Sequence, residues 1–185
     1  MSSDSRLMWP FANKKQNVTT EQFAMALLEL MRKHAEGFCS GLQKSAEEKW
    51  NLAPDEVVIL GDELLNVYLW MVSLILGKDK QVLNLLHDAH FARAYNSGST
   101  KEEKARLANS AQEQLSERYT KYYKAWSDDM KANRSTALPM EIAQFLFPKR
   151  KPVLDIFLWV PIREQTAGFM ISAAELRERF EIVET

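Results

Sequence analysis

Three histidines are the side chains of this sequence best suited to holding a metal ion: His34, His87 and His90. His34 and His90 fall on the apolar faces of the helices predicted around them. His87 and His90 stand one helical turn apart, so both can point to the same side. Three imidazoles brought together in a helical bundle would bind zinc, iron or haem. The favoured interpretation is that each is a separate, hydrogen-bonded core residue, with no metal or cofactor.

A second group of candidate residues interrupts the most apolar helix predicted in the chain. Asp62, Glu63 and Asn66 are the strong polar groups in the middle of residues 54–77. Facing His87 or His90, one of these carboxylates would serve as a general base. The alternative, which is favoured, is a narrow stripe that faces solvent.

Few other patterns in the sequence point to catalysis. His34 on the first helix of an all-α chain is faintly similar to the haem oxygenases, but only over His34-Ala35-Glu36. The glycine-rich distal helix of that family is absent, so no family is assigned. The chain also lacks a Glu-x-x-His pair, a phosphate loop and a dinucleotide fingerprint. Whether the protein is an enzyme is therefore left open.

The elements that must position these residues are organised around residues 54–77. Pro54 suits a first helical turn and Gly77 a left-handed helix end. The helix is apolar over about two thirds of its circumference, taking 100° per residue, and must be surrounded by other elements. Its uninterrupted apolar run is only 67–76, shorter than the roughly 20 residues of a membrane span. We therefore predict a core helix.

Apolar residues at steps of three and four predict three further main helices, over about 20–50, 80–96 and 100–134. Capping boxes at Thr19–Gln22 and Thr100–Glu103 mark two of their starts, and Asp79 is expected to cap a third. The predicted fold is an all-α bundle of four main helices, in one domain over 18–185 that follows a flexible tail over 1–17.

The last part of the chain is harder to interpret. A short helix is expected over 139–147, followed by a basic, proline-bracketed loop over 148–152. Residues 153–160 and 166–171 are predicted either as a short β-hairpin or as buried helix, because apolar runs this short fit both. Ser172 and Glu175 have the spacing of a capping box for a last helix over 173–183.

Charge and cysteine content limit the class of protein. The net charge of −1 over 185 residues gives no field that would recruit nucleic acid, so no nucleic-acid partner is expected. The single cysteine, Cys39, excludes an internal disulfide and fits a reducing, cytoplasmic location. Trp9 and Phe11 in the tail are unlike a membrane anchor, since one aromatic pair is too weak.

Aromatic residues in predicted exposed positions suggest a protein interface. Trp70 shares the polar stripe of the central helix, and Tyr122, Tyr123 and Trp126 lie near one another on the fourth. Such residues are enriched at interfaces. By elimination, we predict a non-enzymatic interaction or regulatory module with a protein partner or as a homodimer. The alternative is a bundle that binds a metal, haem or small ligand through the three histidines.

Overall fold

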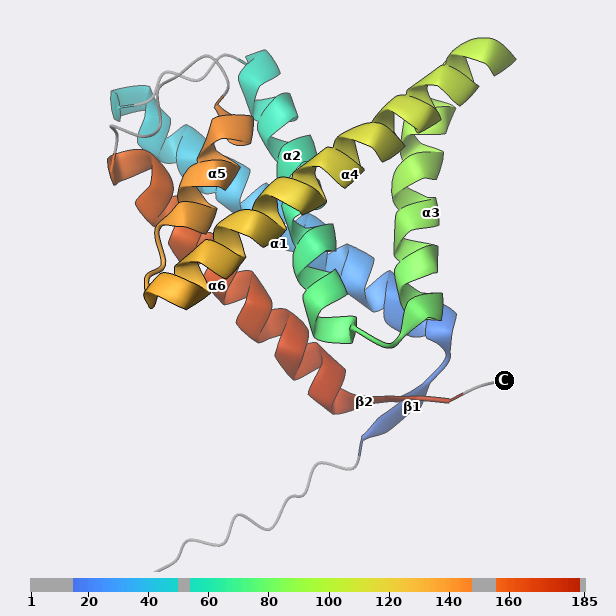
Figure 1. Cartoon of the computed structure of the whole chain (residues 1–185). Helices are drawn as coiled ribbons and strands as arrows, with labels where there is room; N and C mark the ends of the chain where they lie inside the picture. The colour runs from blue at the N-terminus through green and yellow to red at the C-terminus, as the bar shows by residue number, and fades with distance from the viewer. Residues whose placement is uncertain (1–14, 50–53, 148–155, 184–185) are drawn as a thin grey trace, which may run out of the picture.

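The computed structural model describes residues 15–49, 54–147 and 156–183. Within these ranges the chain forms six α-helices and two very short strands (Figure 1). In chain order, the elements are β1 (Gln16–Val18), α1 (Thr20–Lys49), α2 (Pro54–Leu76), α3 (Lys80–Asn96), α4 (Lys101–Ala132), α5 (Ala137–Leu146), α6 (Ile156–Arg179) and β2 (Phe180–Ile182). The predicted all-α bundle is confirmed.

Helix α2 forms the centre of the bundle, as its apolar circumference requires. It contacts α1, α3, α4, α5 and α6 (Figure 1). Its buried apolar residues are Leu60, Leu64, Val67, Tyr68, Leu69, Trp70, Met71, Val72 and Leu76. The helix ends at Gly77, whose φ of +44° lies in the left-handed region that glycine enters without steric cost.

The same helix is long and apolar enough, by length and composition, to cross a membrane over Ile59–Leu76. Of that stretch, 61% is buried inside the fold. A helix whose apolar surface is covered by five others is typical of the core of a soluble protein.

Two of the predicted helix starts have the expected capping geometry. The Thr19 hydroxyl accepts from the backbone N–H of Gln22 at 3.2 Å, and the Gln22 amide oxygen accepts from the backbone N–H of Thr19 at 3.0 Å. The Thr100 hydroxyl accepts from the backbone N–H of Glu103 at 3.1 Å. These reciprocal bonds satisfy helix-end N–H groups that have no partner within the helix.

The prediction that Asp79 caps α3 with its side chain is wrong. Asp79 precedes the helix but makes no side-chain capping bond. Its carboxylate instead pairs with the Arg177 guanidinium of α6 at 3.2 Å. The charge-assisted bond to Arg177 is stronger than a bond to the neutral N–H groups at the start of α3. Asp79 therefore links the α2–α3 turn to the end of α6.

Helix α4 is long and extends well beyond the bundle on one side (Figure 1). At its start, Gly98 lies so close to α4 that an added Cβ would fall 2.8 Å from the backbone nitrogen of Lys104. Only glycine fits there. At its other end, Asn133 has φ +49°, and the chain reverses into α5.

The predicted hairpin does not form. Residues 156–179 are one helix, α6, with Pro161 in its second turn. Proline removes one backbone hydrogen bond there but does not end the helix. Ile162, Thr166, Phe169 and Ala173 are buried at helical spacing, and this stripe packs against α1 and α2. The Ser172–Glu175 pair therefore lies inside a helix and caps nothing.

The two strands join the ends of the described chain. Gln16 pairs in parallel with Phe180, and Val18 with Ile182 (Figure 1). The prediction of a tail over 1–17 is therefore wrong for residues 16–17, which are held by β2. Residues 1–14, with Trp9 and Phe11, and the basic segment 148–152 lie outside the described residues.

Candidate functional site

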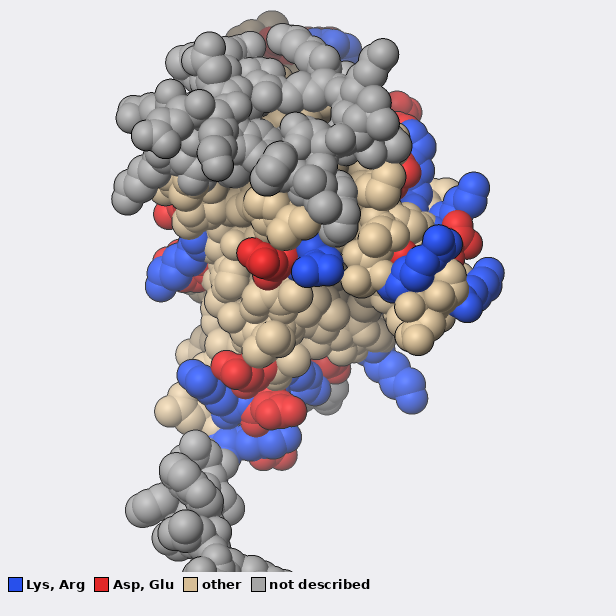
Figure 2. All heavy atoms as spheres, turned by 90° about the vertical axis from the view of Figure 1, so that its left-hand side faces the viewer, with Lys and Arg blue, Asp and Glu red and all other residues tan. Residues whose placement is uncertain are grey.

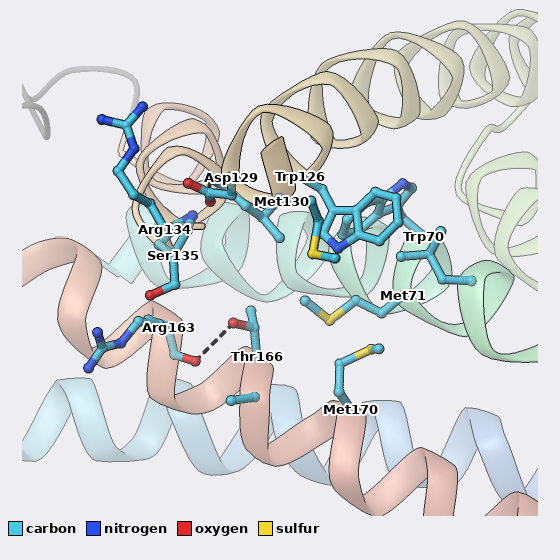
Figure 3. A pocket seen from close by; sticks show the side chains of 14 residues that line it. Trp70, Met71, Trp126, Asp129, Met130, Arg134, Ser135, Arg163, Thr166 and Met170 are labelled. Carbon is cyan, nitrogen blue, oxygen red and sulfur yellow. Dashed lines mark hydrogen bonds between the residues drawn. The ribbon is translucent and has the colours of Figure 1, made fainter. Parts of the chain in front are cut away.

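An apolar groove lies between α4 and α6, with α2 as its floor (Figure 3). Its volume is about 270 Å³. We call it the α4–α6 groove. Its lining residues are Trp70, Met71 and Leu74 from α2; Trp126, Asp129 and Met130 from α4; Arg134, Ser135, Leu138 and Pro139 from the α4–α5 turn and the start of α5; and Arg163, Thr166, Ala167 and Met170 from α6.

Sulfur and aromatic side chains dominate the wide end of this groove. Figure 3 shows Met71, Met130 and Met170 converging beside Trp70 and Trp126. Met130 is 66% exposed, although it is a large apolar residue. Flexible thioethers adapt to partners of different shape, and an exposed apolar patch is typical of a binding surface.

The polar groups buried in the groove are already satisfied within the fold. The Asp129 carboxylate accepts from the backbone N–H groups of Thr136, Ala137 and Leu138, at 3.1, 2.9 and 2.9 Å. Burial alone would raise the pKa of Asp129, but these three bonds hold it below its usual value. Asp129 thus caps α5 from the end of α4.

Thr166 is satisfied in the same way, because its hydroxyl donates to the Arg163 carbonyl at 3.0 Å (Figure 3). Arg134 and Arg163 lie at the end of the groove opposite the methionines, and their guanidinium groups point outward from it (Figure 3). Neither guanidinium pairs with a carboxylate among the residues that the structure describes. The groove is therefore apolar with a cationic end.

The charges on the face seen in Figure 2 alternate in sign. Lys and Arg lie beside Asp and Glu at its lower end and right-hand edge, while its middle carries few charged residues. No continuous basic surface of the kind that binds nucleic acid is visible among the described residues of this face.

The predicted solvent-facing stripe on α2 is wrong for two of its three members. Glu63 and Asn66 are only 7% and 8% exposed. Glu63 accepts from the Tyr122 hydroxyl at 2.6 Å and pairs with Arg118 at 3.0 Å. A buried carboxylate needs a cation, and α4 crosses α2 where it can supply one. Asp62 alone faces outward, paired with Arg93 at 2.8 Å.

Two of the four predicted interface aromatics belong to the core. Trp70 is 2% exposed and Tyr122 is fully buried, with their rings edge to face at 5.7 Å. The prediction that they are exposed is wrong because α4 covers the side of α2 that carries the polar residues. Tyr123 is 55% exposed and contacts the half-buried Trp126, with ring centres 5.6 Å apart.

His34 joins α1 to α6 rather than to the other histidines. Its Nδ1 lies 3.2 Å from the Gln165 amide nitrogen, which also donates to the His34 carbonyl and to the Tyr68 hydroxyl. Its ring stands edge to face on Phe169 at 5.4 Å. Burial lowers the pKa of His34. It is thus a hydrogen-bonded residue between helices.

His87 and His90 share a side of α3 but have different neighbours. His87 Nε2 lies 2.9 Å from the Tyr119 hydroxyl of α4. His90 lines a second cavity, together with Asp62 and Asn66. Burial is the main cause that lowers the pKa of both imidazoles. Over the described ranges, no three His, Cys, Asp or Glu side chains are arranged to hold a metal ion.

Cys39 is partly buried on α1, and burial raises the pKa of its thiol. The thiol form therefore prevails at neutral pH, which is unlike a catalytic cysteine.

Sequence reasoning named Trp70, Trp126, Asp62, Asn66 and His90 but missed other residues of the two hollows and of the buried ion pair. Arg118 and Arg93 are the ion-pair partners of the α2 carboxylates, and Met71, Met130 and Met170 line the groove. A signal existed for Arg118, because a carboxylate on a helix that must be enclosed predicts a buried cation. The methionines are eight in number, but only tertiary structure brings three of them together.

Comparison with known protein families, with curated proteins and with solved structures finds no match to this chain.

Proposed function

We propose that this protein is a non-enzymatic interaction module whose α4–α6 groove receives an amphipathic helix of a partner protein. The observation that carries the proposal is the apolar lining of the groove: Met130 is exposed at its edge, Met170 and Trp126 are half-buried in its walls, and the buried Met71 and Trp70 form its floor. Large apolar side chains gathered in a concave surface cost solubility unless a partner covers them.

The shape of the groove favours a helix as its occupant. Helices α4 and α6 form its two walls, and α2 forms the floor between them (Figure 3). A partner helix laid into such a wedge buries apolar residues spaced at three and four, one turn after another. Tyr123 and Trp126 extend the apolar surface along α4 and would border the bound helix.

The charges at one end indicate the chemistry of the partner. Arg134 and Arg163 line the groove without an ion-pair partner among the described residues. The Asp129 carboxylate in the same groove accepts three backbone N–H groups and lies under the influence of the Arg134 charge, which offsets its repulsion of an acidic partner. We therefore propose that the partner carries Asp or Glu beside its apolar anchors. The single cysteine fits a reducing compartment, so we propose that the partner is bound in the cytoplasm.

Two synthetic helical peptides test this assignment by fluorescence anisotropy. Both carry Leu and Trp anchors at helical spacing, and they differ only in having Glu or Lys at the flanking positions. We expect the Glu peptide to bind at least about tenfold more tightly than the Lys peptide. Met130→Glu should abolish binding, while the control Met25→Glu should not. Met25 is an equally exposed helical methionine, at 70%, that does not line the groove.

Three outcomes would overturn the proposal. One is that neither peptide binds the wild type. Another is that binding survives Met130→Glu. The third concerns self-association, measured by light scattering. A species of twice 21.4 kDa that Met130→Glu reduces to 21.4 kDa, and Met25→Glu leaves intact, would assign the groove to a second copy of the chain.

A further inference from the structure

A second hollow, enclosed by α2, α3 and α4, has the opposite character to the groove. Figure 1 shows that α3 meets α2 at their short connecting turn and diverges from it beneath α4. The cavity between the three helices measures about 320 Å³. Its lining residues are Asp62, Asn66, His90, Arg93, Ala94, Ser97, Ala111 and Gln114. We propose that it binds a small zwitterion of the α-amino-acid class, independently of the groove.

One buried oxygen atom in the lining of this cavity lacks a hydrogen-bond donor. Asn66 is 92% buried, since only 8% of it is exposed, and its Oδ1 accepts no hydrogen bond. Its Nδ2 donates to Glu63 Oε2 at 3.4 Å, which leaves Oδ1 as the acceptor without a partner. An unsatisfied buried acceptor costs about 1–3 kcal/mol. A ligand that brings an N–H donor removes that cost.

The charges around Asn66 match a molecule with one positive and one negative group. Asp62, one helical turn before Asn66, is paired with Arg93 at 2.8 Å, so the two charges balance. His90 beside them is kept neutral by burial and by Arg93. An ammonium group would bind Asp62 and Asn66 Oδ1, and a carboxylate would bind the Arg93 guanidinium in bidentate fashion.

The Asp62–Arg93 pair can give way to such a ligand. Its side chains are 55% and 61% exposed, so the pair is weak and easily exchanged. Asp62 and Arg93 also line another hollow of about 410 Å³, together with Arg32, Glu36 and Cys39 among others. Small walls at Ala94 and Ala111 leave room for the side chain of the ligand.

Isothermal titration of the whole chain with each of the common L-amino acids tests the proposal. We expect one or a few of them to bind. The corresponding amine, which lacks the carboxylate, and the corresponding carboxylic acid, which lacks the ammonium group, should each bind at least about tenfold more weakly. Asn66→Leu and Arg93→Gln should each weaken binding by about tenfold or more. The control is Arg179→Gln, because Arg179 is likewise exposed and ion-paired, with Glu175, but lies outside the cavity.

Thermal denaturation without ligand separates binding from folding. Arg93→Gln should unfold close to the wild type, since it removes only an exposed pair. Arg93→Gln therefore keeps the test valid even if Asn66→Leu disturbs Glu63. The proposal is overturned if no amino acid binds the wild type, if Arg93→Gln binds as the wild type does, or if Arg179→Gln weakens binding equally.

Discussion

The Tyr122 hydroxyl of α4 donates to Glu63 of α2 at 2.6 Å, and neither side chain reaches the surface. The Arg118 guanidinium completes the group and stacks 3.9 Å above the Phe145 ring of α5. Burial and the adjacent Glu63 carboxylate raise the pKa of Tyr122. Three helices, α2, α4 and α5, are thereby joined around one carboxylate.

Removing Arg118 should therefore be strongly destabilising. Arg118→Met leaves Glu63 charged, buried and short of its cation, and we expect the free energy of unfolding to fall by about 3–5 kcal/mol. The double variant Arg118→Met/Glu63→Gln should lose less than the single variant, because no bare charge is left behind. Urea denaturation of the two variants checks this, and a double variant that is less stable than Arg118→Met would contradict it.

The face of α2 opposite this cluster should behave as hydrophobic core. Leu69 is 1% exposed, so Leu69→Ala should cost about 2–5 kcal/mol of unfolding free energy. Ile59→Ala on the same helix is the control, because Ile59 is 47% exposed and should lose much less. A loss below about 1 kcal/mol for Leu69→Ala would show that this face is not core.

How much the sequence predicts depends on whether the signal is local. The central helix, its Gly77 end and two capping boxes are set by neighbouring residues, and these predictions are confirmed. The exposure of Glu63, Asn66 and Trp70 was predicted wrongly because it depends on α4, which is distant in sequence. A helical wheel shows which residues share a side of a helix, but not what covers that side.

The structure of residues 153–171 could not be decided from the sequence for a different physical reason. Ile162, Thr166, Phe169 and Ala173 form a helical stripe, yet the short apolar runs on either side of Pro161 fitted a strand and a buried helix equally well. A window long enough to include 162–173 would have found the period of the helix. The α4–α6 groove and the polar cavity could not have been found this way, because each is built from three or more separate helices.

The cap that α4 supplies to α5 gives another test of the groove wall. Asp129→Ala removes three hydrogen bonds to the start of α5 and should cost about 1–3 kcal/mol, above the usual value for one cap. Asp128→Ala is the matched control, since Asp128 is exposed beside it. Equal losses in the two variants would mean that the buried cap contributes little. A larger loss for Asp129→Ala should be accompanied by weaker peptide binding in the groove.

The histidines should not supply a metal site. His34 is engaged by Gln165, and His87 lies beside Tyr119, so the imidazoles serve separate contacts. Elemental analysis of protein purified without a histidine tag should find no stoichiometric zinc or iron. Stoichiometric metal that disappears in His90→Gln would contradict this and make the protein a metalloprotein.

The same three imidazoles should make the fold less stable in mild acid. Burial is the main cause that lowers the pKa of His34, His87 and His90 in the folded protein. In the unfolded chain each titrates near its ordinary value of about 6.5. As the pH falls below that value, the unfolded state takes up protons first, so the free energy of unfolding decreases.

Urea denaturation at about pH 7.5 and about pH 5.5 measures this effect, because the window lies above the range in which carboxylates titrate. We expect lower stability at the acidic value and a smaller loss in His90→Gln. Among the groups around His90, Arg93 and His87 lower its pKa, while Asp62 and Glu63 raise it. Arg93→Gln removes the largest of the lowering charges and should therefore also reduce the loss. Equal or greater stability at pH 5.5 in the wild type would show that the folded protein accepts these protons as readily as the unfolded chain.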